Sequence, residues 1–185
     1  MKRKSILVSM VALAAVCLAV LAGCGGPSVE ELITQDLTEQ FDEIKGGSDD
    51  FIKGLDEASG DEFKTLGIDA KEYAKAYLDG FDYKIENVTV DEDKGAATAE
   101  VTITCKSMNT IIDDFSNKFL EDVAALDTTP SEDDLNKMAG QVMMDVTKST
   151  KPKDSKVTFK YTKDKDNAWS ADDSATNEMM DAMLN

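Results

Sequence analysis

Few side chains in this sequence of 185 residues have the type and spacing that chemistry requires. It contains three cysteines, Cys17, Cys24 and Cys105, and 37 acidic residues, but no histidine. Without histidine the chain cannot form a Ser-His-Asp or Cys-His nucleophile system, or the commonest zinc and copper ligand sets. A thiol that accepts a covalent group and a carboxylate that acts as acid or base are the chemistries that remain.

Neither the acidic clusters nor the methionines favour a metal site. An EF-hand calcium loop requires oxygen ligands at positions one, three and five. Loops counted from Asp91 and Asp164 fail because Gly95 and Ala168 stand at position five. The methionines follow apolar helical spacing, which indicates core packing rather than copper(I) ligation, with an adaptable apolar pocket as the alternative. We expect no metal and no cofactor.

The N-terminal residues are arranged as a secretory signal. A basic KRK at residues 2–4 precedes an apolar run at residues 6–22, which only Ser9 interrupts. The run is slightly shorter than the roughly 20 residues that a membrane-spanning helix needs. We therefore expect residues 1–23 to be a cleaved signal peptide, and an uncleaved transmembrane anchor is the alternative.

Leu21, Ala22, Gly23 and Cys24 end this apolar run, and they resemble the lipobox of bacterial lipoproteins. The resemblance implies that signal peptidase recognises the first three residues, cuts before Cys24 and leaves diacylglycerol on its sulfur. Two acyl chains suffice for stable membrane anchoring where one does not. Cys17 fits less well because no leucine stands three residues before it. The expected location is the extracytoplasmic face of the cell membrane, after secretion through the general pathway.

The mature chain would be strongly acidic. Loss of residues 1–23 leaves 17 Lys and Arg against 37 Asp and Glu, a net charge of about −20. Such a chain repels nucleic acid and anionic headgroups, so we expect no nucleic-acid partner and membrane contact only through the diacylglycerol on Cys24. With Cys24 acylated, Cys105 has no disulfide partner, and the domain must depend on its hydrophobic core.

The remaining sequence predicts one α+β domain at residues 29–185, joined to Cys24 by a tether at residues 24–28. Apolar residues at helical spacing predict helices around residues 29–44, 51–58, 70–77, 108–126, 135–146 and 179–184. Period-two alternation predicts strands around residues 83–90, 97–105 and 157–162, and a short strand around Trp169. We expect an antiparallel sheet of about four strands with helices packed on one face.

Local signals support these elements. Ser28, Ser48 and Ser131 can cap the helices that follow them, and Asp69 with Glu72 is typical of a capping box. A break in the alternation at residues 86–87 predicts a β-bulge. The stretch that contains Phe63, Leu66 and Ile68 shows no clear element.

The hairpin YKIENVTVDEDKGAATAEVTIT, the later segment KVTFKYTKDKDNAWSADD and the last helix resemble bacterial lipoproteins with a small domain of unknown function. Such domains are often related to nuclear-transport-factor-two-like or cystatin-like folds. The resemblance covers about residues 70–185, and it implies a curved sheet wrapped by helices, sometimes with a pocket. It implies no activity, because relatives include binding proteins, enzymes and interaction modules.

Several residues allow both a structural and a functional interpretation. Tyr73, Tyr77, Tyr83 and Trp169 could line a pocket, and core packing is the alternative. Cys105 lies on the inner face of its strand, where a buried thiol is expected. Seven lysines at residues 148–166 indicate an edge strand protected against strand association, rather than a dock for a polyanion.

These observations favour a membrane-anchored extracytoplasmic lipoprotein that serves binding or interaction and is not an enzyme. The alternative is a pocket protein that captures a small apolar or cationic ligand between sheet and helices. An enzyme that uses carboxylates is less expected, because no pair stands out among the 37 acids. We expect a protein or a small ligand as the partner of the domain.

Overall fold

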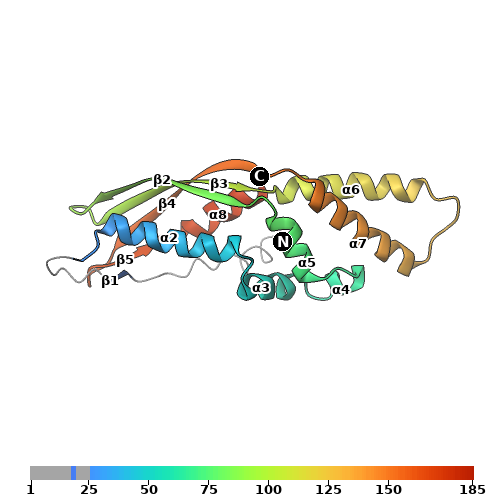
Figure 1. The fold of residues 1–185 in the computed structure, drawn as a ribbon, viewed down its shortest axis with the longest axis horizontal. Helices are drawn as coiled ribbons and strands as arrows, with labels where there is room; N and C mark the ends of the chain where they lie inside the picture. Colours follow the sequence, from blue (N-terminus) through green and yellow to red (C-terminus); the bar gives the residue numbers. More distant parts are fainter. Residues whose placement is uncertain (1–17, 20–25) are drawn as a thin grey trace.

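The computed structural model describes residues 18–19 and 26–185, which form seven helices and one antiparallel sheet (Figure 1). In chain order the elements are β1 (Leu18–Ala19), α2 (Val29–Lys45), α3 (Asp49–Ser59), α4 (Glu62–Leu66), α5 (Ala70–Leu78), β2 (Asp82–Asp91), β3 (Ala96–Cys105), α6 (Met108–Ala124), α7 (Glu132–Ser149), β4 (Lys153–Lys163), β5 (Ala168–Ala171) and α8 (Ser174–Leu184). The α+β fold class is confirmed. Four helices rather than three precede the strand pair, because the stretch left unassigned in the sequence contains α4.

The predicted helix starts are confirmed by their capping contacts. The Ser28 hydroxyl accepts a hydrogen bond from the backbone of Glu31, whose side chain accepts one in return from the Ser28 backbone. Ser131 forms the same reciprocal capping box with Asp134 at the start of α7, and the Ser48 hydroxyl accepts from the Phe51 backbone at the start of α3. The capping box predicted for Asp69 with Glu72 is only half formed, because the Asp69 side chain accepts from the Glu72 backbone and the Glu72 side chain returns no bond. Each contact satisfies a backbone donor that has no partner within its helix.

The sheet has the strand order β1-β5-β4-β3-β2. The register of the β2–β3 hairpin shifts between Ile85 and Asn87, so the predicted bulge is confirmed. β4 pairs with β3 along its length but with β5 only at residues 161–163. Four strands match the expected sheet, and β1, which pairs with β5, is a fifth strand from within the predicted signal peptide. Residues 153–160 of β4, which include several of the lysines, therefore pair with β3 on one side and not with β5 on the other. β4 resembles the predicted edge strand only over this part of its length.

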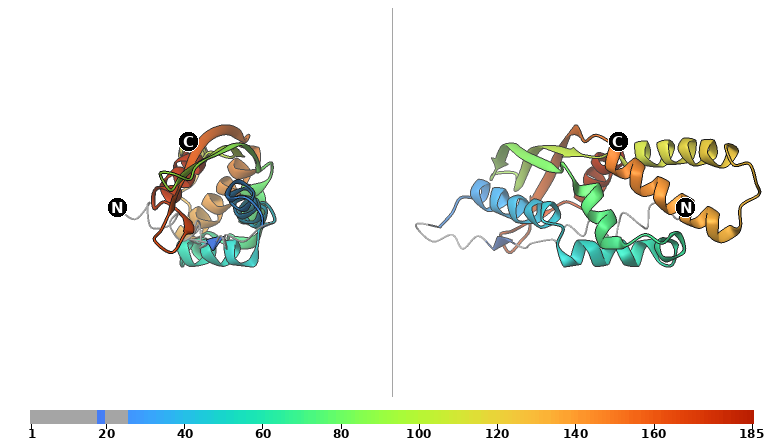
Figure 2. Two further views of the ribbon diagram at one scale, coloured as in Figure 1. Left: turned by 90° about the vertical axis from the view of Figure 1, so that its left-hand side faces the viewer. Right: turned by 45° about the vertical axis from the view of Figure 1, so that its right-hand side comes forward.

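α2 and α8 cover one face of the sheet (Figures 1 and 2). The strands direct apolar side chains toward these helices, and the Phe41 ring of α2 lies 6.0 Å from the Phe159 ring of β4. Buried apolar residues from Val29 to Met183 form one continuous cluster. The segment 26–185 thus contains a hydrophobic core of its own, which is what independent folding requires.

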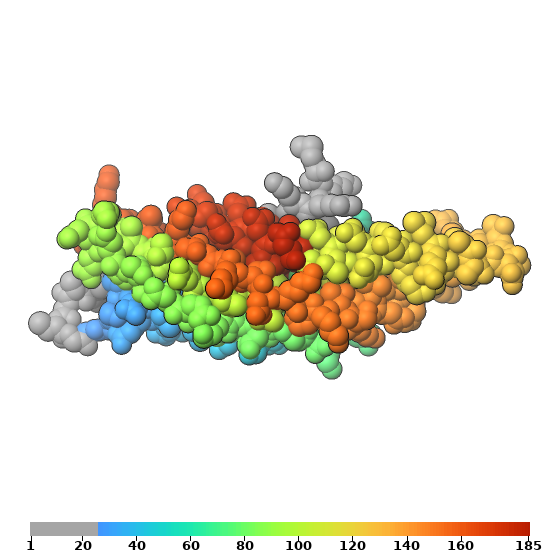
Figure 3. Space-filling view, turned by 90° about the horizontal axis from the view of Figure 1, so that it is seen from above, coloured from blue at the N-terminus to red at the C-terminus, as the bar shows by residue number. Residues whose placement is uncertain are grey.

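α6 and α7 are placed differently from the expectation that helices cover the sheet. They pack on each other and extend past the sheet to form one end of an elongated molecule (Figures 1 and 3). Ile111 is fully buried, whereas Leu120 is 67% exposed, because the outer half of α6 contacts little besides α7. Gly140 of α7 lies against α4, where a Cβ would stand 2.0 Å from the Leu66 carbonyl oxygen.

Candidate functional site

The predicted lipidation segment, with Leu21, Ala22, Gly23 and Cys24, lies outside the described residues. The description resumes at Gly26, and Gly26, Pro27 and Ser28 are exposed before α2 begins. Among the described residues, no helix has the length and apolar character needed to cross a membrane.

The four aromatic residues that the sequence suggested as pocket lining do not meet in one place. Tyr73 and Tyr77 of α5 are buried, with nearly parallel rings whose centroids lie 6.4 Å apart. Tyr83 of β2 stacks on Phe41 of α2 at 4.8 Å. Trp169 of β5 is 1% exposed. None of the four lines the cavities described below, and the apolar side chains on the inner face of the sheet belong to the buried cluster.

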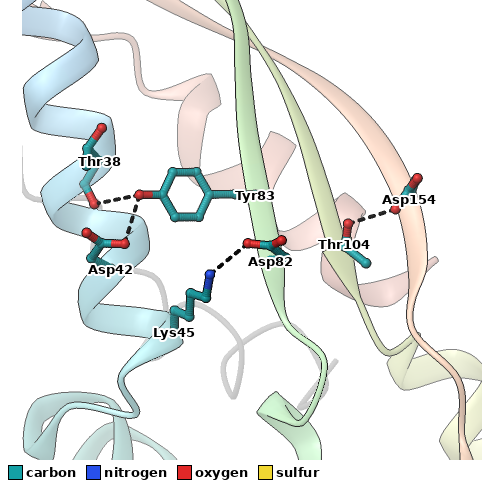
Figure 4. A network of polar contacts seen from close by, with 7 residues as sticks. All are labelled: Thr38, Asp42, Lys45, Asp82, Tyr83, Thr104 and Asp154. Atoms are coloured by element: carbon teal, nitrogen blue, oxygen red, sulfur yellow. Dashed lines mark hydrogen bonds and ion pairs between the residues drawn. The ribbon is translucent and has the colours of Figure 1, made fainter.

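A polar network joins α2 to β2 (Figure 4). The Tyr83 hydroxyl donates to an Asp42 carboxylate oxygen at 2.8 Å and lies 3.3 Å from the Thr38 carbonyl oxygen. One turn along α2, the Lys45 ammonium donates to Asp82 at 2.8 Å. That hydrogen bond lowers the pKa of Asp82 and raises the pKa of Lys45. The network fixes the C-terminal end of α2 against β2.

Beside this network lies a cavity of about 530 Å³, which we call the α2–α5 cavity. Its walls come from the end of α2, from α3, from α5 and from the turn into β2. It is lined by Lys45, Gly46, Gly47, Ile52, Lys71, Ala74, Lys75, Leu78, Asp79, Gly80 and Phe81. Three of these side chains are lysines and one is an aspartate, which is an unusual excess on a chain of net charge −17.

The floor of the α2–α5 cavity is apolar. Ala74 and Phe81 are buried beneath it, and Ile52 and Leu78 are half-buried at its wall. Gly47, which follows α2 with φ of 59°, adds no side chain that would narrow the opening. An apolar floor under a cationic rim can hold a molecule that has an apolar part and an anionic group.

A second cavity of about 410 Å³ lies on the other side of α5. It shares Lys75 and Asp79 with the first and adds Glu72, Lys148 and Met144. Because two lysines face two acids there, this second cavity has no excess of either charge. The α2–α5 cavity is therefore the stronger candidate for binding a charged molecule.

Lys106, which directly follows β3, is a buried cation close to Asp79, a residue that lines both cavities. Its side chain is 2% exposed, and its ammonium donates to the carbonyl oxygens of Ala76 at 2.7 Å and Thr147 at 2.9 Å. The carboxylate of Asp79 lies 3.9 Å away. Burial lowers the pKa of Lys106, and the nearby Asp79 charge opposes that shift. Lys106 thus joins β3, α5 and α7 at one point.

Among the described residues, the carboxyl group whose pKa is raised belongs to Asp36, which lies away from both cavities. Asp36 of α2 is 7% exposed and accepts a hydrogen bond from Gln40 at 2.8 Å; burial raises its pKa. Tyr161 of β4 is its neighbour, and burial together with the Asp36 charge raises the pKa of this phenol. The Tyr161 hydroxyl has no partner among the described residues with the geometry of a hydrogen bond. Asp36 lines none of the cavities described above.

The buried thiol predicted for Cys105 is confirmed. Cys105 is 4% exposed, its sulfur lies 3.3 Å from the Ala182 carbonyl oxygen, and burial raises its pKa to about 11. Met179 and Met183 of α8 are core residues, as their spacing indicates. Within the described part of the chain, no three His, Cys, Asp or Glu side chains are grouped closely enough to hold a metal ion.

The cationic cavity is the feature that sequence reasoning missed. Its local signal is the spacing of Lys71 and Lys75, which lie one turn apart on α5. Lys45, Ile52 and Phe81 come from other segments, and no pattern in the sequence brings them together.

No protein-family model matches the chain, and no curated protein matches its sequence. Among solved structures, the chain is similar to the crystal structure of a candidate lipoprotein, ycdA, from Bacillus subtilis subsp. subtilis str. 168. The TM-score is 0.38 and the identity 17%, over 80% of this chain and 47% of that one. The chain thus spans about half the length of ycdA, and the score is too low to indicate a shared fold.

Proposed function

We propose that this chain is a lipoprotein of the extracytoplasmic membrane face, anchored by diacylglycerol on Cys24, whose domain serves binding rather than catalysis. The observation that carries the proposal is the sequence LAGC at residues 21–24, directly behind a basic head and an apolar run. Two acyl chains on one sulfur would supply stable anchoring without a spanning helix. The expected kinship with nuclear-transport-factor-two-like or cystatin-like domains stays a prediction.

The start of the fold supports a short tether. α2 begins at Val29, and Ser28 is its N-cap, so residues 24–28 separate the expected lipid from the folded domain. Five extended residues span about 17 Å at most. The domain would therefore stay close to the bilayer surface, with the N-terminal end of α2 nearest to it.

The charge pattern of the cavities supports binding rather than catalysis. Lysines and apolar side chains line the α2–α5 cavity, and these groups attract and hold a solute. The one carboxyl group whose pKa is raised, Asp36, is packed in the core among the described residues. A carboxylate acid–base mechanism would need such a group at a cavity wall.

A labelling experiment tests the lipid anchor. Cells that express the full chain would be given radioactive palmitate, with variants Cys24→Ala, Cys17→Ala and Cys105→Ala in parallel. We expect label on the wild type and on the Cys17 and Cys105 variants, and none on Cys24→Ala. The proposal fails if the wild type carries no label, or if label persists on Cys24→Ala.

The alternative function, capture of a small ligand, is best placed in the α2–α5 cavity. The sequence suggested a pocket between sheet and helices for an apolar or cationic molecule, where the described residues form a continuous buried cluster. The α2–α5 cavity lies at the end of α2, and its lysines favour an anion instead.

A further inference from the structure

We infer that the α2–α5 cavity binds a small organic anion, with its phosphate or carboxylate group at Lys71 and Lys75 and its apolar part against Ile52, Leu78 and Phe81. The inference names the ligand class for the binding role proposed above. Binding in the cavity does not depend on the lipid anchor, because every residue involved lies within the folded domain. The choice of a dissolved ligand over a lipid headgroup rests on the proposed anchor.

Two of the neighbouring acids are already engaged by other lysines, whereas Glu72, which borders the second cavity with Lys75, takes part in no ion pair found within residues 26–185. Asp82 accepts the hydrogen bond from Lys45 at 2.8 Å, and Asp79 lies 3.9 Å from the buried ammonium of Lys106. Lys71 and Lys75 take part in none of the ion pairs found within residues 26–185. Two cations therefore remain at the rim, and an external anion can pair with them.

The position of Lys71 is electrostatically unfavourable, whereas Lys75 has Glu72 three residues before it and Asp79 four residues after it. Lys71 and Lys75 stand four residues apart on α5, a spacing that places like charges side by side on a helix surface. Lys71 also lies in the first turn of α5, where the partial positive charge of the helix terminus repels a cation. An anion at the rim would relieve both repulsions.

The apolar floor sets the second requirement for the ligand. Phe81 is 5% exposed, and Ile52 and Leu78 present half-buried side chains beside it. A cavity of about 530 Å³ is within the usual size of small-molecule sites. A bare inorganic ion would leave this floor in contact with water, so an anion that carries a short apolar group fits better.

The net charge of the chain does not prevent this binding. The domain's excess of about 20 negative charges repels anions at long range. At physiological ionic strength, however, charges on the surface are largely screened beyond about 8 Å. Within that range the lining of the cavity carries three lysines against one aspartate, Asp79.

The location of the cavity indicates a dissolved ligand rather than a lipid headgroup. α2 has 17 residues, so its two ends lie about 25 Å apart. The tether meets the N-terminal end of α2, and the cavity adjoins its C-terminal end at Gly46 and Gly47. When the proposed anchor holds the N-terminal end of α2 at the bilayer and the helix points away from it, the cavity lies up to about 25 Å farther out.

The test uses segment 26–185, which contains the whole core, and titrates it calorimetrically with hexyl phosphate, hexanoate, hexanol and inorganic phosphate. We expect saturable binding of hexyl phosphate, hexanoate or both, and the tighter of the two identifies the preferred anionic group. The double variant Lys71→Gln/Lys75→Gln should weaken it about tenfold or more. The matched control, Lys156→Gln/Lys160→Gln, removes two exposed lysines from β4 and should change the affinity less than about twofold.

Four outcomes would overturn the inference. The first is that the wild type binds neither amphiphilic anion, and the second is that the two double variants weaken binding equally. The third is that hexanol or inorganic phosphate binds as tightly as hexyl phosphate. The fourth is that the domain sediments with vesicles of phosphatidylglycerol and that the Lys71→Gln/Lys75→Gln variant does not. Palmitate labelling at Cys24 is independent of all four, so failure of the anchor and failure of the cavity can be told apart.

Discussion

The ammonium of Lys106 donates a hydrogen bond to the carbonyl oxygen of Thr147 from a fully buried position. It donates a second bond to the carbonyl of Ala76. Both carbonyls belong to the last turns of helices, α7 and α5, where backbone acceptors lack helical partners and the helix dipole is negative. One cation thus caps two helix ends, which explains why a lysine is stable inside this domain.

Lys106→Met tests this shared cap. Methionine fills similar space but leaves the two carbonyls without their donor, so we expect a loss of about 3 kcal/mol in the free energy of unfolding. Urea denaturation of segment 26–185 measures it. Lys53→Met, at an exposed position of α3, should change the stability by less than about 0.5 kcal/mol. A urea midpoint for Lys106→Met equal to that of the wild type would contradict the role of Lys106 as a cap of two helix ends.

Asp36→Asn should stabilise the domain at neutral pH. Because the folded-state pKa of Asp36 is raised above 3.8, the folded protein holds this proton more tightly than the unfolded chain. The free energy of unfolding therefore falls as pH rises from 3.8 through the folded pKa, and the penalty persists above it. Asparagine keeps an oxygen that can accept from Gln40 and removes the charge.

We expect a gain on the order of 1 kcal/mol at pH 7, and none at pH 3, where the acid is protonated in both states. Urea denaturation at the two pH values measures the difference. Asp113→Asn, an exposed acid on α6, controls for the change in net charge. An equal gain at both pH values would show that the buried charge is not the cause.

Gly140→Ala should destabilise the domain. In a helix interior this substitution ordinarily adds about 0.5–1 kcal/mol of stability, because glycine loses more backbone entropy. Here the new Cβ would meet the Leu66 carbonyl oxygen at 2.0 Å, so α7 and α4 must separate. We expect a loss of about 2 kcal/mol or more in thermal or urea unfolding. A stabilised variant would mean that the two helices do not approach this closely.

Alanine substitutions along α6 should show where the helix leaves the core. Ile111→Ala removes a fully buried side chain and should cost about 3 kcal/mol. Leu120→Ala removes one that is 67% exposed and should cost less than about 0.5 kcal/mol. Equal costs in urea denaturation would indicate that the outer half of α6 is covered in solution.

Cys105 should be unreactive in the folded state. With its pKa raised to about 11, roughly one thiol in a thousand is ionised at pH 8, and the sulfur is buried. Segment 26–185 contains Cys105 as its single cysteine. We expect the thiol reagent DTNB to react with it only after urea is added, and rapid reaction in native buffer would contradict the buried position.

Most secondary structure could be predicted because its signals are local. Ser28, Ser48 and Ser131 cap helices through groups three residues away, and the bulge at Ile85 is visible as a break in alternation. α4 was missed because five residues are too few to show a helical period. The apolar stripe of α6 was identified correctly, but the pattern alone does not say which surface covers it.

The sequence alone determined the class of the fold, the order of all elements except α4 and β1, the acidity of the chain and the lipobox-like segment at its N-terminus. These follow from composition, from periodicity and from contacts between residues a few positions apart. Only the tertiary structure decided that Lys45, Lys71 and Phe81 border one cavity and that Lys106 lies inside. Such groupings depend on how α2, α5 and the strands pack, and the packing joins residues that no local pattern relates.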